Sequence, residues 1–283
     1  MSKVSKVKFE NNLKETILKA VDLIGGFSKF INTGDVVFLK PNFNTADPFP
    51  ASSDPEFLKQ VVELTYDYGA KTVIVGDSST YTLNTRKVME KLKIFDLQNM
   101  ERPPRIYVFE ERGWIKKEIP NAKYLKSVTV PEILDRADKL ILLPCLKTHS
   151  QAQFTGSLKL SVGFVRSLER VRLHSYYLLK NFQRKIAELN KIINPSLIIM
   201  DGRKCFINEG PAKGEIREPN VILASTDRVA IDVEGIKIIQ SFKRNSLRNL
   251  NPWEIPQIQA AVEFNLGAKN EKDYQVLSED NEM

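Results

Sequence analysis

His149 and His174 are the two histidines of the 283-residue chain, and a side chain that titrates near neutral pH is a natural candidate for chemistry. His149 ends the run Leu146-Lys147-Thr148-His149, which places an ammonium group two residues before an imidazole. An imidazole can act as acid, base or metal ligand, and the ammonium attracts anions. We expect His149 and Lys147 to be catalytic, together with Asp201. The alternative is a loop histidine hydrogen-bonded to backbone.

His174 precedes residues 178–193, whose apolar side chains recur at helical spacing. The N-terminal end of a helix favours a bound anion, so His174 is a candidate substrate-binding residue. A capping or surface role explains the same position equally well.

Two loops combine a flexible backbone with an ammonium group. Residues 155–159 (TGSLK) hold the components of an anion-binding nest, although their spacing is not that of a nucleotide-binding P-loop. Residues 209–214 (EGPAKG) form a tight loop around one carboxylate and one ammonium. A plain turn and an ordinary surface loop are the respective alternatives. The candidate substrate-binding residues here are Thr155, Gly156, Lys159, Glu209, Gly210 and Lys213.

Several carboxylates could supply the oxygen ligands that a divalent metal ion prefers. They match no known metal-binding spacing, so a divalent ion stays an open expectation. Asp227 is better explained as a helix cap, because it follows Ser225-Thr226. The carboxylates considered are Asp77, Asp201, Glu209, Asp227 and Asp232.

Other groups allow two interpretations. Cys145 follows a strand and lies near Lys147, which favours thiolate, but an inert buried cysteine is the commoner case. Arg166, Arg170 and Arg172 could bind a carboxylate or phosphate with forked donors, or could be solvated loop charges.

Five short, apolar, β-branched runs alternate with helical patterns along the chain, which predicts an α/β fold. Such runs are typical of buried parallel strands, so we expect a largely parallel central sheet with helices on both faces. Residues 101–130 break the alternation and are interpreted as an inserted segment. The predicted strands are 35–40, 71–77, 139–144, 196–201 and 220–225.

The ends of these strands carry polar residues. Parallel strands end at the same sheet edge, where α/β proteins bind ligands. We therefore expect one cleft that contains Asn42, Asp77, Lys147, His149 and Asp201. The polar segment 150–172 that follows is expected to be a mobile lid or binding loop.

Composition sets the broad class. Hydrophobic residues at 42% and charged residues at 27% are globular values, and we expect a single domain over 1–283 that ends in a polar tail, 268–283. No apolar run is long enough for a membrane span or a signal peptide, so we expect a cytoplasmic protein without a membrane partner. The net charge of +7 favours anionic partners, but its spread along the chain disfavours nucleic acid.

The joint pattern resembles the family catalogued as domain of unknown function 362, over residues 35–267. The resemblance implies a fold and candidate site residues, including Lys40 and Ser78, more than a reaction. Many relatives carry a ferredoxin-like module with eight cysteines, which implies redox work for them. This chain has two cysteines, so it holds no such iron–sulfur cluster. The motifs are Lys40-Pro41-Asn42, Gly76-Asp77-Ser78, Lys147-Thr148-His149, Thr155-Gly156, Lys159, Gly163, His174, Asp201-Gly202, Glu209-Gly210-Pro211 and Ala224-Ser225-Thr226-Asp227.

Three functions remain open at this point. The first is an enzyme acting on a small carboxylate- or phosphate-bearing metabolite, bound by Lys147, Lys159 and Lys213, with His149 transferring a proton. In it Asp77, Asp201 or Glu209 would orient the imidazole or bind a divalent ion. The second is a redox or ligand-binding accessory subunit that works with a separate iron–sulfur protein. The third is nucleic-acid binding.

Overall fold

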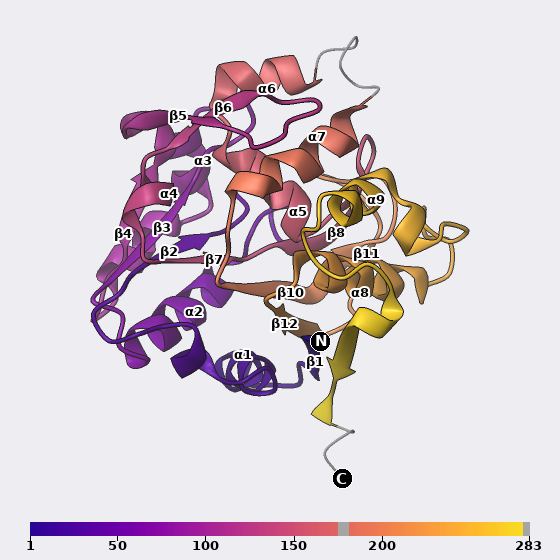
Figure 1. Ribbon diagram of the computed structural model, residues 1–283. Helices are drawn as coiled ribbons and strands as arrows, with labels where there is room; N and C mark the ends of the chain where they lie inside the picture. The colour runs from indigo at the N-terminus through magenta and orange to yellow at the C-terminus, as the bar shows by residue number, and fades with distance from the viewer. Residues whose placement is uncertain (175–180, 280–283) are drawn as a thin grey trace.

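The computed structural model describes residues 1–174 and 181–279, apart from the side chains of residues 172–174. It is a mixed α/β fold built on a large, mostly parallel sheet, as the sequence predicts (Figure 1). The strands are β1 (Ser2–Lys8), β2 (Val36–Lys40), β3 (Thr72–Asp77), β4 (Arg105–Val108), β5 (Trp114–Glu118), β6 (Ser127–Pro131), β7 (Lys139–Leu142), β8 (Cys145–His149), β9 (Gln153–Thr155), β10 (Leu197–Phe206), β11 (Ile216–Arg217), β12 (Val221–Ser225) and β13 (Tyr274–Leu277).

The main path through the sheet runs β13-β1-β12-β10-β7-β2-β3-β4. The five strands β10, β7, β2, β3 and β4 pair in parallel, whereas β12 pairs antiparallel with both β10 and β1. Short β8 extends the sheet beside the second half of β10 and pairs antiparallel with β9. The strands that precede the candidate site therefore lie side by side.

Helices cover both faces of the sheet. In Figure 1, α1 and α2 lie beneath it and α5 to α7 lie above it. Neighbouring strand residues point to opposite faces, so Phe38 joins the core under α7 to α9 while Val37 and Leu39 join the core over α1 and α2. The helices are α1 (Leu13–Asp22), α2 (Pro55–Asp67), α3 (Thr85–Lys91), α4 (Ile133–Arg136), α5 (Ser157–Leu160), α6 (Ser167–His174), α7 (Phe182–Leu189), α8 (Arg228–Gln240) and α9 (Pro256–Glu263).

Caps read from the sequence begin two of these helices. Asp54 accepts a hydrogen bond from the Glu56 N–H, and Pro55 occupies the first turn of α2. Asp227 accepts from the N–H groups of Val229 and Ala230, so its role as the cap of α8 is confirmed.

The structure corrects several boundaries. Only part of 101–130 is an insertion, because β4 joins the main sheet and the β5–β6 hairpin forms a separate two-stranded sheet. Part of the expected polar tail, 274–277, is strand β13, which pairs with β1. The helix expected over 178–193 is α7 followed by a 3₁₀ turn, within the residues described.

The segment expected to be a lid is well anchored over its first part. It contains β9, α5 and a 3₁₀ turn, and Phe154, Leu158, Phe164 and Val165 are fully buried in the core. The sequence conceals this, because three polar residues of the segment, Thr155, Ser157 and Ser161, are buried as well. These residues are part of the body of the fold.

Candidate active site

Lys40 and Asp77 form a buried ion pair at the ends of β2 and β3. The Lys40 Nζ lies 2.6 Å from the Asp77 Oδ1, and both side chains are almost fully buried. Asp77 also accepts hydrogen bonds from the N–H groups of Phe43 and Ser78, each at 2.7 Å. Burial lowers the pKa of Lys40, and the carboxylate of Asp77 opposes that effect. The pair thus fixes the two loops that leave these strands.

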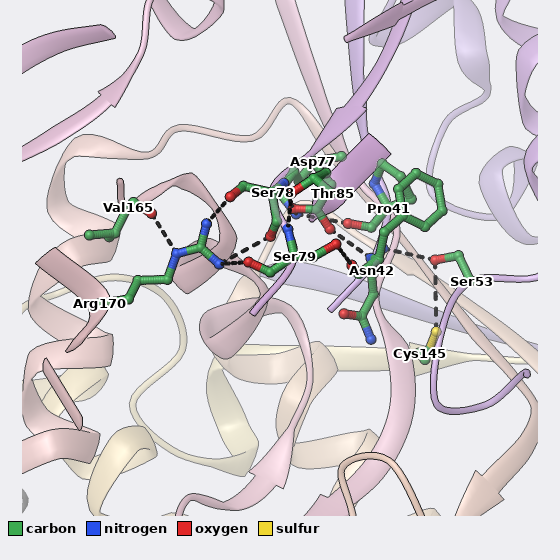
Figure 2. A network of polar contacts seen from close by, with 12 residues as sticks. Pro41, Asn42, Ser53, Asp77, Ser78, Ser79, Thr85, Cys145, Val165 and Arg170 are labelled. Atoms are coloured by element: carbon green, nitrogen blue, oxygen red, sulfur yellow. Dashed lines mark hydrogen bonds and ion pairs between the residues drawn. The ribbon is translucent and has the colours of Figure 1, made fainter. Parts of the chain in front are cut away.

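Arg170 ties α6 to the loop after β3. Its Nε donates to the Val165 carbonyl at 2.6 Å, and one Nη donates to the carbonyls of Ser78 and Ser79 at 3.1 and 2.7 Å (Figure 2). Its other Nη bonds the Ser78 hydroxyl, which also bonds Glu110. Arg170 is 3% exposed, and burial lowers its pKa. Its guanidinium therefore positions the backbone of the loop after β3 and adds positive charge to that region.

Lys147 lies on β8, not in a loop after the previous strand. Pro144 ends β7, but the chain resumes as a strand at Cys145 because β10 is long enough to pair with it. The Lys147 ammonium donates to the Ala51 carbonyl. Burial lowers its pKa to about 8, although Cys145 and Asp47 act in the opposite direction.

Lys159, on α5, is half-buried beside other cations. Burial is the main cause that lowers its pKa to about 7, and the charges of Lys147 and Arg170 lower it further. Among the residues that the structure describes, no carboxylate lies within ion-pair distance of Lys147 or Lys159. Two ammonium groups therefore share one region without a neutralising partner.

Asp232, from α8, holds the turn that carries Lys159. Its two carboxylate oxygens accept from the N–H groups of Ser157 and Leu158 at 2.6 and 3.0 Å. Burial raises the pKa of Asp232 to about 7, and these hydrogen bonds oppose the rise. A Cβ on Gly156 would lie 2.3 Å from the Asp232 Oδ1, so only glycine fits there. Asp232 is a structural anchor, which its spacing in the sequence does not reveal.

His149 is oriented by backbone. Its Nδ1 accepts from the N–H groups of Gln151 and Ala152 at 3.0 and 3.1 Å. Two donors that point at one nitrogen require that nitrogen to be unprotonated, so the ring hydrogen is on Nε2. This neutral tautomer can donate a hydrogen bond to a ligand, and it is not suited to accept a proton at Nε2.

One cavity of about 400 Å³, within the usual range for small-molecule sites, is lined by Lys40, Asp77, Arg170, Lys147, Lys159 and His149. Among the described residues, its charged lining groups are four cations and one carboxylate. The sequence-predicted residues that it contains are Lys40, Asn42, Asp77, Ser78, Lys147, His149, Thr155 and Lys159, and Arg170, Tyr81, Asn44 and Pro211 also line it. The Thr155 hydroxyl is one of the few buried polar groups in the described chain that lack a hydrogen-bond partner.

Asp201 is not part of this cavity. It lies in the middle of β10, and Arg203 binds both its oxygens, with Nε 3.0 Å from Oδ1 and Nη2 2.7 Å from Oδ2. Arg203 also bonds Asp54 at 2.6 Å and lies near three phenylalanine rings. Burial raises the pKa of Asp201, and Arg203 opposes that rise. The carboxylate is engaged in the architecture.

The loop 209–214 contributes shape more than charge. Glu209 and Lys213 are exposed and do not line the cavity, whereas Pro211 does. Gly210 has φ +68°, and a Cβ there would lie 2.0 Å from the Thr148 carbonyl oxygen. The close approach of this loop to β8 therefore requires glycine.

The other candidate residues are His174 and the two cysteines. The backbone of His174 ends α6, and its side chain lies outside the described part of the structure. Cys145 and Cys205 are buried, and burial raises their pKa values to about 11 and 12, which makes both thiols inert. In residues 1–174 and 181–279, no three His, Cys, Asp or Glu side chains form a group that could hold a metal ion. The divalent ion stays a prediction.

The comparison with family models decides the affiliation of the chain. Residues 37–237 match the model described as Domain of unknown function (DUF362). The chain belongs to the DUF362 family. This match covers the strands and loops that build the cavity.

Two individual proteins are similar to this DUF362 protein. A thylakoid-associated protein of Synechocystis sp. is 27% identical over 260 residues, which cover 90% of this chain and 76% of that protein. The lactate racemase apoprotein of Thermoanaerobacterium thermosaccharolyticum has a similar fold, with a TM-score of 0.51 and 13% identity. That likeness covers 84% of this chain and 58% of the racemase, so the chain spans little more than half its length. None of the described helices is both long and apolar enough to cross a bilayer.

Proposed function

We propose that this DUF362 protein is an enzyme that binds a small carboxylate- or phosphate-bearing metabolite in the cavity lined by Lys147, His149 and Lys159. One observation carries the proposal: among the described residues that line the cavity, Lys40, Lys147, Lys159 and Arg170 face the single carboxylate of Asp77. Lys40 is paired with that carboxylate, so the other cations leave excess positive charge. An anionic ligand would neutralise it and relieve their mutual repulsion.

The side chains divide the work of binding and proton transfer. Lys147 and Lys159 bind the negative group, and the Nε2–H of His149 donates a hydrogen bond to a ligand oxygen. The proton-accepting role that the sequence suggests for His149 passes to Lys159. An amine with a pKa of about 7 is suited to that role because at neutral pH about half of the protein molecules carry it in the uncharged form.

The similarity to a racemase named for lactate is compatible with a small carboxylate ligand, but it is a similarity of fold alone. A separate iron–sulfur partner and nucleic-acid binding stay predictions from the sequence.

Thermal unfolding with inorganic phosphate or pyruvate tests the proposal. A ligand at 100 times its Kd stabilises a protein by about 2.7 kcal/mol, which raises the Tm measurably. We expect this rise in the wild type and in the Lys213→Met control, whose substituted lysine is exposed outside the cavity. We expect its loss in Lys147→Met. An equal rise in Lys147→Met and wild type, or none in wild type with any of a panel of small anions, would contradict the proposal.

A further inference from the structure

Unlike the other amines of the cavity, the amine of Lys159 has no hydrogen-bond or ion-pair partner among the described residues. The Lys40 ammonium is held by Asp77, and the Lys147 ammonium donates to the Ala51 carbonyl. No hydrogen bond or ion pair holds the amine of Lys159 within the described chain, and its cationic neighbours oppose its protonation. A desolvated lysine beside other cations is a recognised form of activated amine nucleophile.

We propose that Lys159 forms a covalent imine with the carbonyl carbon of an anionic 2-oxo acid held in the cavity. This deepens the proposed function and rests on it, because the ligand's carboxylate must first bind the cations. The assignment combines an amine without a polar partner among the described residues, an excess of cationic side chains and a cavity of about 400 Å³, which fits a small metabolite.

The covalent step balances without a redox partner. The neutral Nζ attacks the carbonyl carbon and forms a C–N bond, while the π electrons move to the carbonyl oxygen. That oxygen gains two protons, one from the attacking amine and one from the ammonium of Lys147, and leaves as water. The product is a protonated imine, and Lys147 regains its proton from solvent. With a pKa of about 8, Lys147 is mostly protonated at neutral pH and can act as this acid.

The polar lining fits a 2-oxo acid. Thr155 is 6% exposed, and its hydroxyl has no partner in the described chain although the residue lines the cavity. A buried hydroxyl without a partner is costly, so a ligand oxygen that bonds it would be stabilised. We place the ligand's carboxylate by Lys147 and Thr155. The adjacent carbonyl oxygen then lies between the Nε2–H of His149 and the same Lys147 ammonium, which can protonate it.

Reductive trapping tests the imine. The full chain is incubated with pyruvate and sodium cyanoborohydride, and the adduct is located by peptide mass spectrometry. We expect one stable adduct at Lys159, and labelling lower by more than about tenfold in Lys159→Met, as for removal of an activated nucleophile. The Lys213→Met control should be labelled like the wild type. Excess phosphate should compete with labelling in the wild-type chain.

The outcomes separate this inference from the proposed function. If phosphate and pyruvate raise the Tm but trapping leaves Lys159 unmodified, the anion site stands and the imine is wrong. If neither ligand raises the Tm and no adduct forms, both are wrong. Equal labelling of Lys159 and Lys213 would show ordinary amine reactivity and would overturn the imine. Mapping and phosphate competition use the wild type, so they decide the question even if Lys159→Met does not fold.

Discussion

The Lys40 ammonium lies 2.6 Å from the Asp77 carboxylate where two adjacent parallel strands end, and both groups are almost fully removed from solvent. The pair holds the floor of the cavity, because Asp77 also binds the backbone of both following loops. The position is tightly enclosed, since a Cβ on Gly163 would lie 2.7 Å from the Asp77 Oδ1 and 2.8 Å from the Lys40 Nζ. Because Asp77 pairs with Lys40, the ammonium groups of Lys147 and Lys159 stay available for a ligand.

Asp77→Asn should destabilise the protein strongly, because it leaves Lys40 buried without its counter-charge. Breaking a buried pair costs about 3–5 kcal/mol. Urea unfolding would measure the loss, with Asp67→Asn as the control. Asp67 pairs with Lys14 and Arg102 at the partly exposed surface, where such pairs contribute about 0–1 kcal/mol. Equal losses in the two variants would argue against a structural role for the buried pair.

Gly156→Ala should weaken anion binding as well as stability. The new Cβ would collide with Asp232, so the turn that carries Lys159 must shift. Overpacking of this kind costs about 1–3 kcal/mol. Gly34→Ala is the matched control, since a Cβ there meets nothing within 4 Å although its φ of +95° is strained. Calorimetric titration with phosphate should show weaker binding only for Gly156→Ala. Unchanged affinity in that variant would mean that Lys159 does not bind the anion.

His149→Ala should cost about 1–3 kcal/mol of stability, because it leaves the N–H groups of Gln151 and Ala152 without their acceptor. The imidazole is 8% exposed, so water cannot fully replace it. Nitrogen NMR of the wild type should find Nδ1 unprotonated and Nε2 protonated at neutral pH. A protonated Nδ1 would contradict this account and restore His149 as a candidate acid.

Lys159 should make stability depend on pH. Its pKa of about 7 in the folded protein lies below the ordinary value of 10.5, so the unfolded chain binds more protons between these values. Stability therefore rises with pH across this window, and the folded state is penalised at lower pH. Lys159→Met should reduce that rise most strongly between about pH 7 and 8, because Lys147, with a pKa of about 8, still contributes above that range. Lys213→Met should preserve the full rise. Parallel stability profiles for wild type and Lys159→Met, measured by urea unfolding, would show that the amine titrates normally.

Sequence patterns predict the positions of five strands and of several helices, but they do not give the order of the strands in the sheet. The apolar runs before Asn42 and Asp77 predict buried parallel strands, and the structure places both residues at one end of the sheet beside Lys147 and His149. Lys147 and His149 are expected after the end of strand 139–144, but they lie on a further strand, β8. Pro144 ends only one strand, and the long β10 offers a second pairing edge. Local sequence does not show which distant strand is long enough to pair.

The sequence itself contains the signal that Asp201 is paired within its own strand. The apolar run before Asp201 suggests a strand end, yet β10 continues to Phe206, and Arg203 on the same strand pairs with the carboxylate. Side chains two residues apart share a strand face, so this spacing already indicates a local pair. By contrast, the Ala51 carbonyl that binds Lys147 and the α8 carboxylate that binds the α5 turn depend on long-range packing. No sequence motif marks either contact.

A crystal structure of the wild-type protein grown with saturating phosphate would test the anion site most directly. We predict phosphate inside the cavity, with its oxygens about 2.7–2.9 Å from the Lys147 and Lys159 amines, the usual length of a charge-assisted hydrogen bond. An empty cavity in a crystal whose solution counterpart shows saturated phosphate binding would contradict the account, as would phosphate bound only outside the lining that includes these two lysines.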